Sequence, residues 1–219
     1  LINKYPEIAI PVAVFKGGSG NDFAWKLYGD LTVSQYFDRV LSGITKQIDG
    51  AICNDHLFIN GFGIGFDGAI VQSMRGKKKI SAGHIAYLFS VIKNVLFFRE
   101  TIIQMQVDQD EVRLETPFLI AVANGERYGG GFRIAPGAVL NDQFLDLILV
   151  KQISPFRRLS KIPLVQKGRH LSLDIVEHIH LKRILIEPSV AVPAHCDGEP
   201  IAAVRYEIKV LPGRYTVFA

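Results

Sequence analysis

From Ile48 onward, short apolar runs recur along the chain, and Gly, Pro, Asn and Asp residues separate them. Several runs alternate apolar with polar residues, which is typical of strands that bury one face. This pattern predicts an antiparallel sandwich or barrel for most of the chain. The expected strands are Leu57–Ile59, Ile102–Val107, Phe118–Ala123, Leu145–Val150, Ile175–Ile179, Ile184–Ile186, Val190–Val192, Ile201–Val204, Ile208–Val210 and Tyr215–Phe218.

The residues before Ile48 follow another order, in which an apolar run at positions 8–14 precedes a glycine-rich stretch. Apolar residues then recur at helical spacing, and a second helix follows capping residues at positions 30, 32 and 34. One strand and two helices cannot bury a core alone, so we expect partner strands from upstream residues. The two helices are indicated by Phe23, Ala24, Leu27 and Tyr28, and by Val33, Phe37, Val40 and Leu41.

Helical patterns interrupt the strands at Phe66–Met74, at His84–Phe98 and, more briefly, at Pro155–Ile162. The second of these lies in the longest apolar stretch, but its spacing is that of a helix with one buried face, and it contains a lysine. The first residues also lack the pattern of a signal peptide. We therefore expect no transmembrane segment.

The composition of the 219 residues, 48% hydrophobic and 21% charged, is that of an ordinary globular protein. The formal net charge of +4 favours anionic partners such as nucleotides or an acidic membrane surface. Nucleic acid is not an expected partner, because the chain has no nucleic-acid motif and no long basic stripe. Cys53 and Cys196 lie far apart and form no metal-spaced pair, which indicates a reduced, cytoplasmic protein.

A candidate phosphate-binding loop joins the first predicted strand to the first helix, where residues 15–24 read FKGGSGNDFA. Its glycines allow a sharp turn and a close approach to a ligand, and the N–H groups of the following helix favour phosphate. Ser19 adds a hydroxyl group, and Asn21 or Asp22 can cap the helix. An ordinary strand-to-helix connection would show the same glycines. The candidate residues are Gly17, Gly18, Ser19, Gly20, Asn21 and Asp22.

Two carboxylates, Asp197 and Glu199, flank Gly198 near the end of the chain. In an extended chain this spacing places both side chains on one face. Two nearby carboxylates raise the pKa of one of them, which suits proton abstraction from a hydroxyl group. A polar hairpin turn is the alternative interpretation of the same residues.

His178 and His180 share a face of a predicted strand, the arrangement among the six histidines that most resembles a metal site. No third ligand lies nearby in the sequence, so an exposed sheet face is expected instead. Asn141 and Asp142 precede a predicted strand and could form a simple turn. The basic run Arg75–Lys79 is by default a solvated loop.

Four stretches, in matching order, resemble the motifs of the diacylglycerol kinase catalytic family, the bacterial lipid kinases related to sphingosine kinases. The glycine-rich loop resembles the family signature G-T-x-N-D-F-A, with Ser19 in place of Thr. The resemblance covers essentially the whole chain, but the G-G-D-G-T motif of the family would lie upstream. We therefore expect this chain to be the C-terminal part of such a kinase. The other stretches are Ile48–Gly50 with Phe58–Gly61, Asn124–Asp146 and Cys196–Pro200.

The resemblance implies an α+β fold of two lobes, with the active site in the cleft between them. A partial α/β nucleotide-binding lobe would be followed by a β-rich antiparallel sandwich lobe. Residues 1–47 would be the remnant of the first lobe, and residues 211–219 would return to it. Residues 48–210 would form the sandwich.

The resemblance also implies a kinase that transfers the γ-phosphoryl group of ATP to a lipid hydroxyl, diacylglycerol-like or sphingoid, with Mg²⁺. Glu199 would be the general base, and Asp197 would orient or polarise it. Mg²⁺ would be held by Asp142 and the backbone carbonyls of Val139 and Phe144. The family usually has glycine where this chain has Gln143, which would distort the loop if that position needs a positive φ.

Such a kinase is expected in the cytoplasm, peripheral at the membrane surface that holds its lipid substrate. The basic run Arg75–Lys79, extended by Arg157, Arg158 and Lys161, would contact anionic headgroups. The sequence leaves a homodimer open.

Two other functions compete with this interpretation. A non-catalytic lipid- or nucleotide-binding module is favoured by the absent G-G-D-G-T motif and by Gln143, and it would bind lipid without consuming ATP. A kinase of a soluble nucleotide such as NAD is the other, because that family shares a related two-lobed plan. The N-D-F-A run argues against it.

Overall fold

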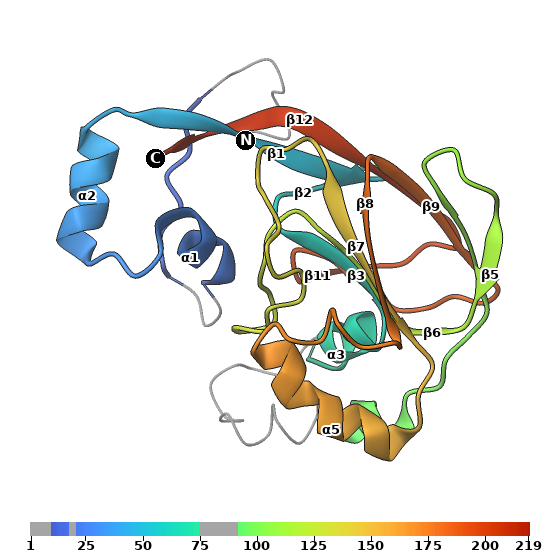
Figure 1. The fold of residues 1–219 in the computed structure, drawn as a ribbon. Coiled ribbons are helices and arrows are strands. Elements are labelled where there is room, and N and C mark those ends of the chain that lie inside the picture. Colours follow the sequence, from blue (N-terminus) through green and yellow to red (C-terminus); the bar gives the residue numbers. More distant parts are fainter. Residues whose placement is uncertain (1–9, 18–20, 75–91) are drawn as a thin grey trace.

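Two antiparallel sheets form most of the molecule in a computed structural model that describes residues 10–17, 21–74 and 92–219 (Figure 1). In these ranges the first sheet has six strands in the order β2–β1–β12–β9–β4–β5. Along the chain these are β1 (Thr45–Cys53), β2 (His56–Phe58), β4 (Ile103–Val107), β5 (Arg113–Glu115), β9 (Arg183–Pro188) and β12 (Tyr206–Phe218).

The second sheet also has six strands within the described ranges, in the order β11–β10–β3–β6–β7–β8. Its neighbours pair antiparallel throughout, and β8 lies at one edge. Its strands are β3 (Gly61–Gly65), β6 (Pro117–Ala123), β7 (Leu145–Lys151), β8 (Val176–Leu181), β10 (Ala194–Cys196) and β11 (Glu199–Ile201).

The main hydrophobic core lies between the sheets and takes side chains from both. Strand β7 shows why the alternating pattern is informative. Leu145, Leu147 and Leu149 point into this core, whereas Ile148 packs into a second cluster on the opposite face. The predicted α+β architecture with an antiparallel sandwich is confirmed.

Four helices have both ends inside the described ranges, and residues 92–97 are also helical. The predicted helix Phe66–Met74 is α3, and α5 (Pro155–Gln166) continues past the predicted end despite an internal proline. The first part of the predicted helix His84–Phe98 lies outside the described residues. The other two helices are α1 (Asp22–Tyr28) and α2 (Val33–Leu41).

Helix α2 begins at a capping box, in which the side chain of Thr32 accepts a hydrogen bond from the N–H group of Gln35 and the side chain of Gln35 accepts one from the N–H group of Thr32. Its buried residue is Tyr36, which packs edge-on against Tyr28 of α1. The apolar face expected from the sequence is instead mostly exposed, with Val33 75% and Leu41 81% accessible. The other two residues of this face are partly covered, because Val40 packs against the cluster of Tyr28 and Tyr36, and the Phe37 ring lies 5.7 Å from that of Phe15.

Strand β12 corrects the prediction of two strands separated by Pro212 and Gly213. It is one continuous strand, and its pairing with β1 shifts register between Ile48 and Gly50, so a bulge absorbs the irregularity. The far end of β12 pairs with residues 45–48 and forms a bridge to Val12. This ribbon of two strands reaches from the sandwich to α1 and α2 (Figure 1).

Other differences concern short or unusual strands. Val190–Val192 was predicted as a strand but is irregular, and Ile201–Val204 contributes only its first residue to β11. Strand β3 is made largely of glycine, and the sequence pattern did not indicate it. It is nevertheless fully buried, because it lies between β10 and β6 in the centre of its sheet.

Candidate functional site

The residues Cys196 to Glu199 form a tight hairpin turn that joins β10 to β11. Cys196 pairs with Glu199, and the two turn residues Asp197 and Gly198 both have positive φ, 48° and 82°. Two successive positive φ values are the mark of a type I′ turn, for which Asp-Gly is a preferred sequence. The extended arrangement, with both carboxylates on one strand face, is therefore wrong, and the hairpin alternative is correct.

The carboxylate of Asp197 is fixed by the chain between β2 and β3. It accepts hydrogen bonds from the N–H groups of Ile59, Asn60 and Gly61 at 2.8, 3.0 and 2.8 Å. Desolvation raises the pKa of Asp197, and these N–H groups oppose that rise. Asp197 thus positions the turn. Glu199 is exposed, and its carboxylate forms no hydrogen bond or ion pair with any other described residue, so the carboxylate is available to a ligand.

Beneath the turn, buried His195 pairs with partly buried Asp67; the sequence drew attention to His195 because it flanks Asp197, but it did not link the two residues. His195 Nδ1 accepts a hydrogen bond from the Gly198 N–H group at 3.2 Å, and its Nε2 lies 3.0 Å from Asp67 Oδ2. Burial alone would lower the pKa of His195, but the carboxylate of Asp67 outweighs it and the pKa is raised. A Cβ on Gly63 would lie 2.2 Å from that carboxylate, so only glycine leaves room for this pair.

The segment at residues 124–131 connects the turn to the rest of the site. The side chain of Asn60 donates to the carbonyl of Arg127 at 2.9 Å, and the side chain of Asn124 donates to the carbonyl of Ile59 at 2.8 Å. Residues 59–60, whose N–H groups bind Asp197, are therefore also hydrogen-bonded to the segment at residues 124–131. Asn60 lies in one of the stretches that resembled the kinase family, but its role depends on a contact 67 residues away.

Helix α1 packs against the other end of this segment. Asp22, its first residue, accepts a hydrogen bond from the N–H group of Gly130 at 3.0 Å, and the guanidinium of Arg127 lies 3.9 Å from the centre of the Trp25 ring. Buried Glu126 pairs with Lys26 of α1 at 3.3 Å. One connecting segment thus contacts both the start of α1 and the support of the hairpin turn.

The predicted phosphate-binding loop is described only in part. Gly18, Ser19 and Gly20 lie outside the described residues. Gly17 has open space where a Cβ would stand. Asn21 occupies the N-cap position of α1 with a left-handed φ of 52°, and its side chain does not cap the helix. Desolvation raises the pKa of Asp22, and the N–H group of Gly130, which donates to its carboxylate, opposes that rise.

The predicted magnesium ligands Val139, Asp142 and Phe144 lie on one exposed loop before β7. One oxygen of Asp142 accepts a hydrogen bond from the Phe144 N–H group at 3.0 Å, and the other forms no hydrogen bond within the described residues. A carboxylate oxygen without a hydrogen bond and the carbonyls of the same loop are oxygen donors, the type of ligand that Mg²⁺ prefers. The residues present therefore fit this ion.

Gln143 adopts the positive φ, 68°, that the family glycine would provide. Its N–H group donates to buried Asp49 at 2.7 Å, and the other oxygen of Asp49 accepts from the Gly213 N–H group at 2.7 Å. The anticipated distortion does not occur, because Asp49 holds the backbone in the left-handed region. The left-handed conformation costs free energy at Gln143, because a residue with a side chain is less stable there than glycine.

Replacing Gln143 with glycine should therefore raise the free energy of unfolding by about 0.5–1 kcal/mol, the cost of a left-handed side-chain residue less the entropy that glycine loses. The hydrogen bond to Asp49 comes from the main-chain N–H group of residue 143, so the glycine variant keeps it. Urea unfolding measures the change. Gln143→Ala is the control, since alanine removes the side chain but keeps the strain and should give no gain. Equal gains from both variants would show that φ is not the cause.

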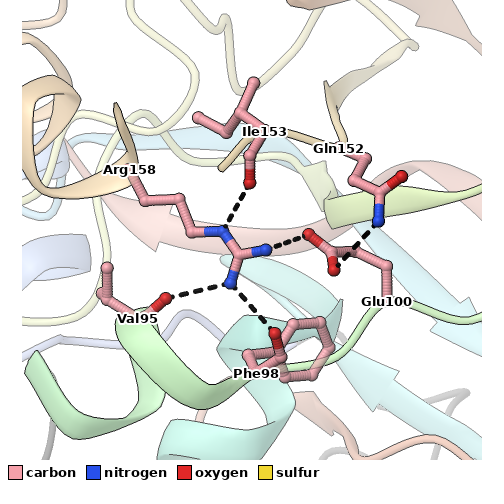
Figure 2. Close-up of polar contacts among 6 residues, drawn as sticks. All are labelled: Val95, Phe98, Glu100, Gln152, Ile153 and Arg158. Atoms are coloured by element: carbon pink, nitrogen blue, oxygen red, sulfur yellow. Dashed lines mark hydrogen bonds and ion pairs between the residues drawn. The ribbon is translucent and has the colours of Figure 1, made fainter. Parts of the chain in front are cut away.

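Arg158 does not belong to the basic surface expected from the sequence. Figure 2 shows its guanidinium enclosed by the carbonyls of Val95, Phe98 and Ile153, with an ion pair to Glu100. Both charged side chains are only 4% exposed. Arg158 therefore fastens α5 to the helical residues 92–97, whereas Arg157 beside it is exposed. The basic run Arg75–Lys79 lies outside the described residues.

Residues 62–219 match the model of a protein family described as the YegS C-terminal NAD kinase beta sandwich-like domain. A diacylglycerol kinase of Mycobacterium tuberculosis is 28% identical over 216 residues, which is 95% of this chain and 69% of that protein. A diacylglycerol kinase of Bacillus subtilis is 27% identical over 86% of this chain and 62% of its own length. The chain thus spans 62–69% of these relatives.

Solved structures share the fold. The crystal structure of a Bacillus anthracis protein described as a "putative diacylglycerol kinase" superposes with a TM-score of 0.78 at 25% identity, and covers 97% of this chain and 69% of its own. Within the described residues, no helix is long and apolar enough to cross a membrane.

Proposed function

Because the chain belongs to the YegS C-terminal domain family, we propose that the intact protein is a lipid kinase that transfers the γ-phosphoryl group of ATP to a lipid hydroxyl. The observation that carries this proposal is the hairpin turn at residues 196–199. Three backbone N–H groups hold Asp197, and Glu199 beside it has an unengaged carboxylate. A positioned but unpaired carboxylate suits a general base.

Phosphoryl transfer depends on positioning the reactants and on balancing negative charge. Glu199 accepts the proton of the lipid hydroxyl as that oxygen attacks the γ-phosphorus, and the bond to the β-phosphate oxygen breaks. Asp197, whose carboxylate accepts hydrogen bonds from three backbone N–H groups of residues 59–61, keeps Glu199 in place. The start of α1, with the glycine-rich loop at residues 17–22, holds the phosphates of ATP. Asp142 and the carbonyls of Val139 and Phe144 would hold Mg²⁺, which supplies positive charge when bound.

The direct test is a phosphoryl-transfer assay on the intact protein with ATP labelled at the γ position. Vesicles that contain diacylglycerol or a sphingoid base, and soluble NAD, are offered separately. We expect label in the lipid fraction with diacylglycerol. Label on NAD would overturn the proposal in favour of a soluble-nucleotide kinase. Binding of diacylglycerol vesicles with no transfer to any acceptor would favour a binding module instead.

We propose that the protein binds peripherally to the cytoplasmic surface of the membrane. Helix α5 and residues 92–97 would form the contact surface. Phe156 is 82% exposed and Phe97 is 74% exposed. Arg157 and exposed parts of α5 stand next to Phe156 in the sequence. Exposed aromatic residues beside cations suit an anionic bilayer surface.

Phe156→Ser should weaken binding to vesicles that contain anionic lipid by about 10- to 100-fold, since a buried aromatic side chain contributes on the order of 1.5–3 kcal/mol. Co-sedimentation with the vesicles measures this. Leu114→Ser is the matched control, because Leu114 is 70% exposed but lies on the edge strand β5. Equal losses in both variants, or no loss in either, would remove α5 as the contact surface.

A further inference from the structure

We propose that Asp146, His178 and His180 form a binding site for a first-row transition-metal dication, Zn²⁺ above all. The three side chains come from neighbouring strands of the second sheet. Asp146 of β7 lies directly opposite His180 of β8, and His178 lies two residues earlier on the same face. The sequence alone offered two histidines and no third ligand. The antiparallel pairing supplies that ligand from 32 residues away.

The distances suit one ion. Both histidines turn Nε2 toward the same carboxylate oxygen, Asp146 Oδ1, at 2.6 Å for His178 and 3.1 Å for His180. The three donor atoms all lie within 4.8 Å of one another, and no other such group of three occurs in the described residues. Ligand atoms around tetrahedral zinc lie about 3.3–3.5 Å apart, given bonds of about 2.0–2.2 Å. Small side-chain shifts would therefore admit the ion.

The donor types select the metal. Two imidazole nitrogens and one carboxylate are a common ligand set for zinc and its neighbours, whereas Mg²⁺ and Ca²⁺ prefer oxygen alone. The site therefore differs in chemistry from the oxygen-only loop at residues 139–144. It does not depend on the proposed kinase activity.

The burial of the three side chains also suits a metal site that an ion can enter from solvent. The Asp146 side chain is 7% exposed and fixed by the sheet, while that of His180 is 59% exposed and that of His178 27%. One ligand is thus held rigidly and the other two face solvent, which leaves a coordination position open to water. Because β8 is an edge strand, a metal bound here would tie that edge to β7.

The test is a titration of untagged protein with Co²⁺, whose visible absorption reports nitrogen coordination, followed by displacement with Zn²⁺. We expect one ion per chain, and a loss of affinity of at least about 100-fold in His178→Gln and in His180→Gln, since even outer partners of a metal ligand contribute 10–100-fold. Excess Mg²⁺ should not displace the cobalt.

His56→Gln is the matched control, because His56 is an exposed strand histidine elsewhere, and it should bind cobalt like the unaltered protein. Asp142→Asn should do the same, which separates this site from the proposed magnesium loop. Thermal melts without metal check that the variants fold. Affinity unchanged in both ligand variants, or no binding of one ion per chain to the unaltered protein at tens of micromolar Co²⁺, would overturn the proposal.

Discussion

Glu199→Gln is expected to reduce turnover by about two to four orders of magnitude, the range that a positioned general base contributes. Glutamine has nearly the same shape as glutamate, but it cannot accept the hydroxyl proton. The fold should not change, because the side chain of Glu199 is exposed and makes no polar contact with other described residues. Initial rates of lipid phosphorylation by the intact protein, at saturating ATP, measure the effect.

Glu111→Gln is the control for this prediction, because Glu111 is an exposed carboxylate in a loop beside β5, on the other sheet. It should keep normal turnover. Vesicle binding by Glu199→Gln should also be normal, which would assign the loss to chemistry and not to membrane contact. If Glu199→Gln turned over at a rate close to that of the unaltered protein, Glu199 would not be the base.

Arg158→Met should lower the free energy of unfolding by about 3–5 kcal/mol, the usual cost of removing one partner from a buried ion pair. Methionine fills part of the space but leaves the Glu100 carboxylate without its partner, in a place where that side chain is 4% exposed. Three backbone carbonyls lose their donor as well (Figure 2). Denaturant unfolding followed by circular dichroism measures the loss.

The adjacent Arg157 supplies the comparison. Arg157→Met changes the same residue type on an exposed part of α5 and should alter stability by no more than about 0.5 kcal/mol. The double variant Glu100→Gln with Arg158→Met should recover part of the loss, because it removes the unpaired charge. Similar losses in the Arg157 and Arg158 variants would mean that the ion pair stabilises nothing.

Local patterns predicted those parts of the fold whose burial follows from neighbours in the sequence. The helix Phe66–Met74 was placed correctly, β4 alternates between buried and more exposed positions, and the apolar runs of β6 and β7 are buried almost throughout. Strand β3 was missed because its three glycines carry no side-chain pattern, and its place is set by its partners β6 and β10. Helix α2 has the expected periodicity, yet its apolar face is exposed.

For the candidate site, too, the sequence indicated residues but not the contacts between distant parts of the chain. The Asp197–Gly198 pair was recognised as a candidate, but the turn that it forms depends on left-handed conformations that spacing does not reveal. Arg158 looked like a surface cation, since nothing in the sequence links it to Glu100. Asp146 could join two histidines only after the register of β7 and β8 was known. The assignments of Glu199, Asp142 and the glycine-rich loop stay predictions.

The bulge in the ribbon of β1 and β12 couples that ribbon to the loop before β7. It lies between Ile48 and Gly50, and Asp49 at the bulge binds the main chain of both Gln143 and Gly213. The N–H group of Asp49 also donates to the carbonyl of Leu140 at 2.6 Å. Because a bulge bends a pair of strands locally, a change in that bend would displace the loop at residues 139–144, which holds the proposed magnesium ligands, together with the ribbon.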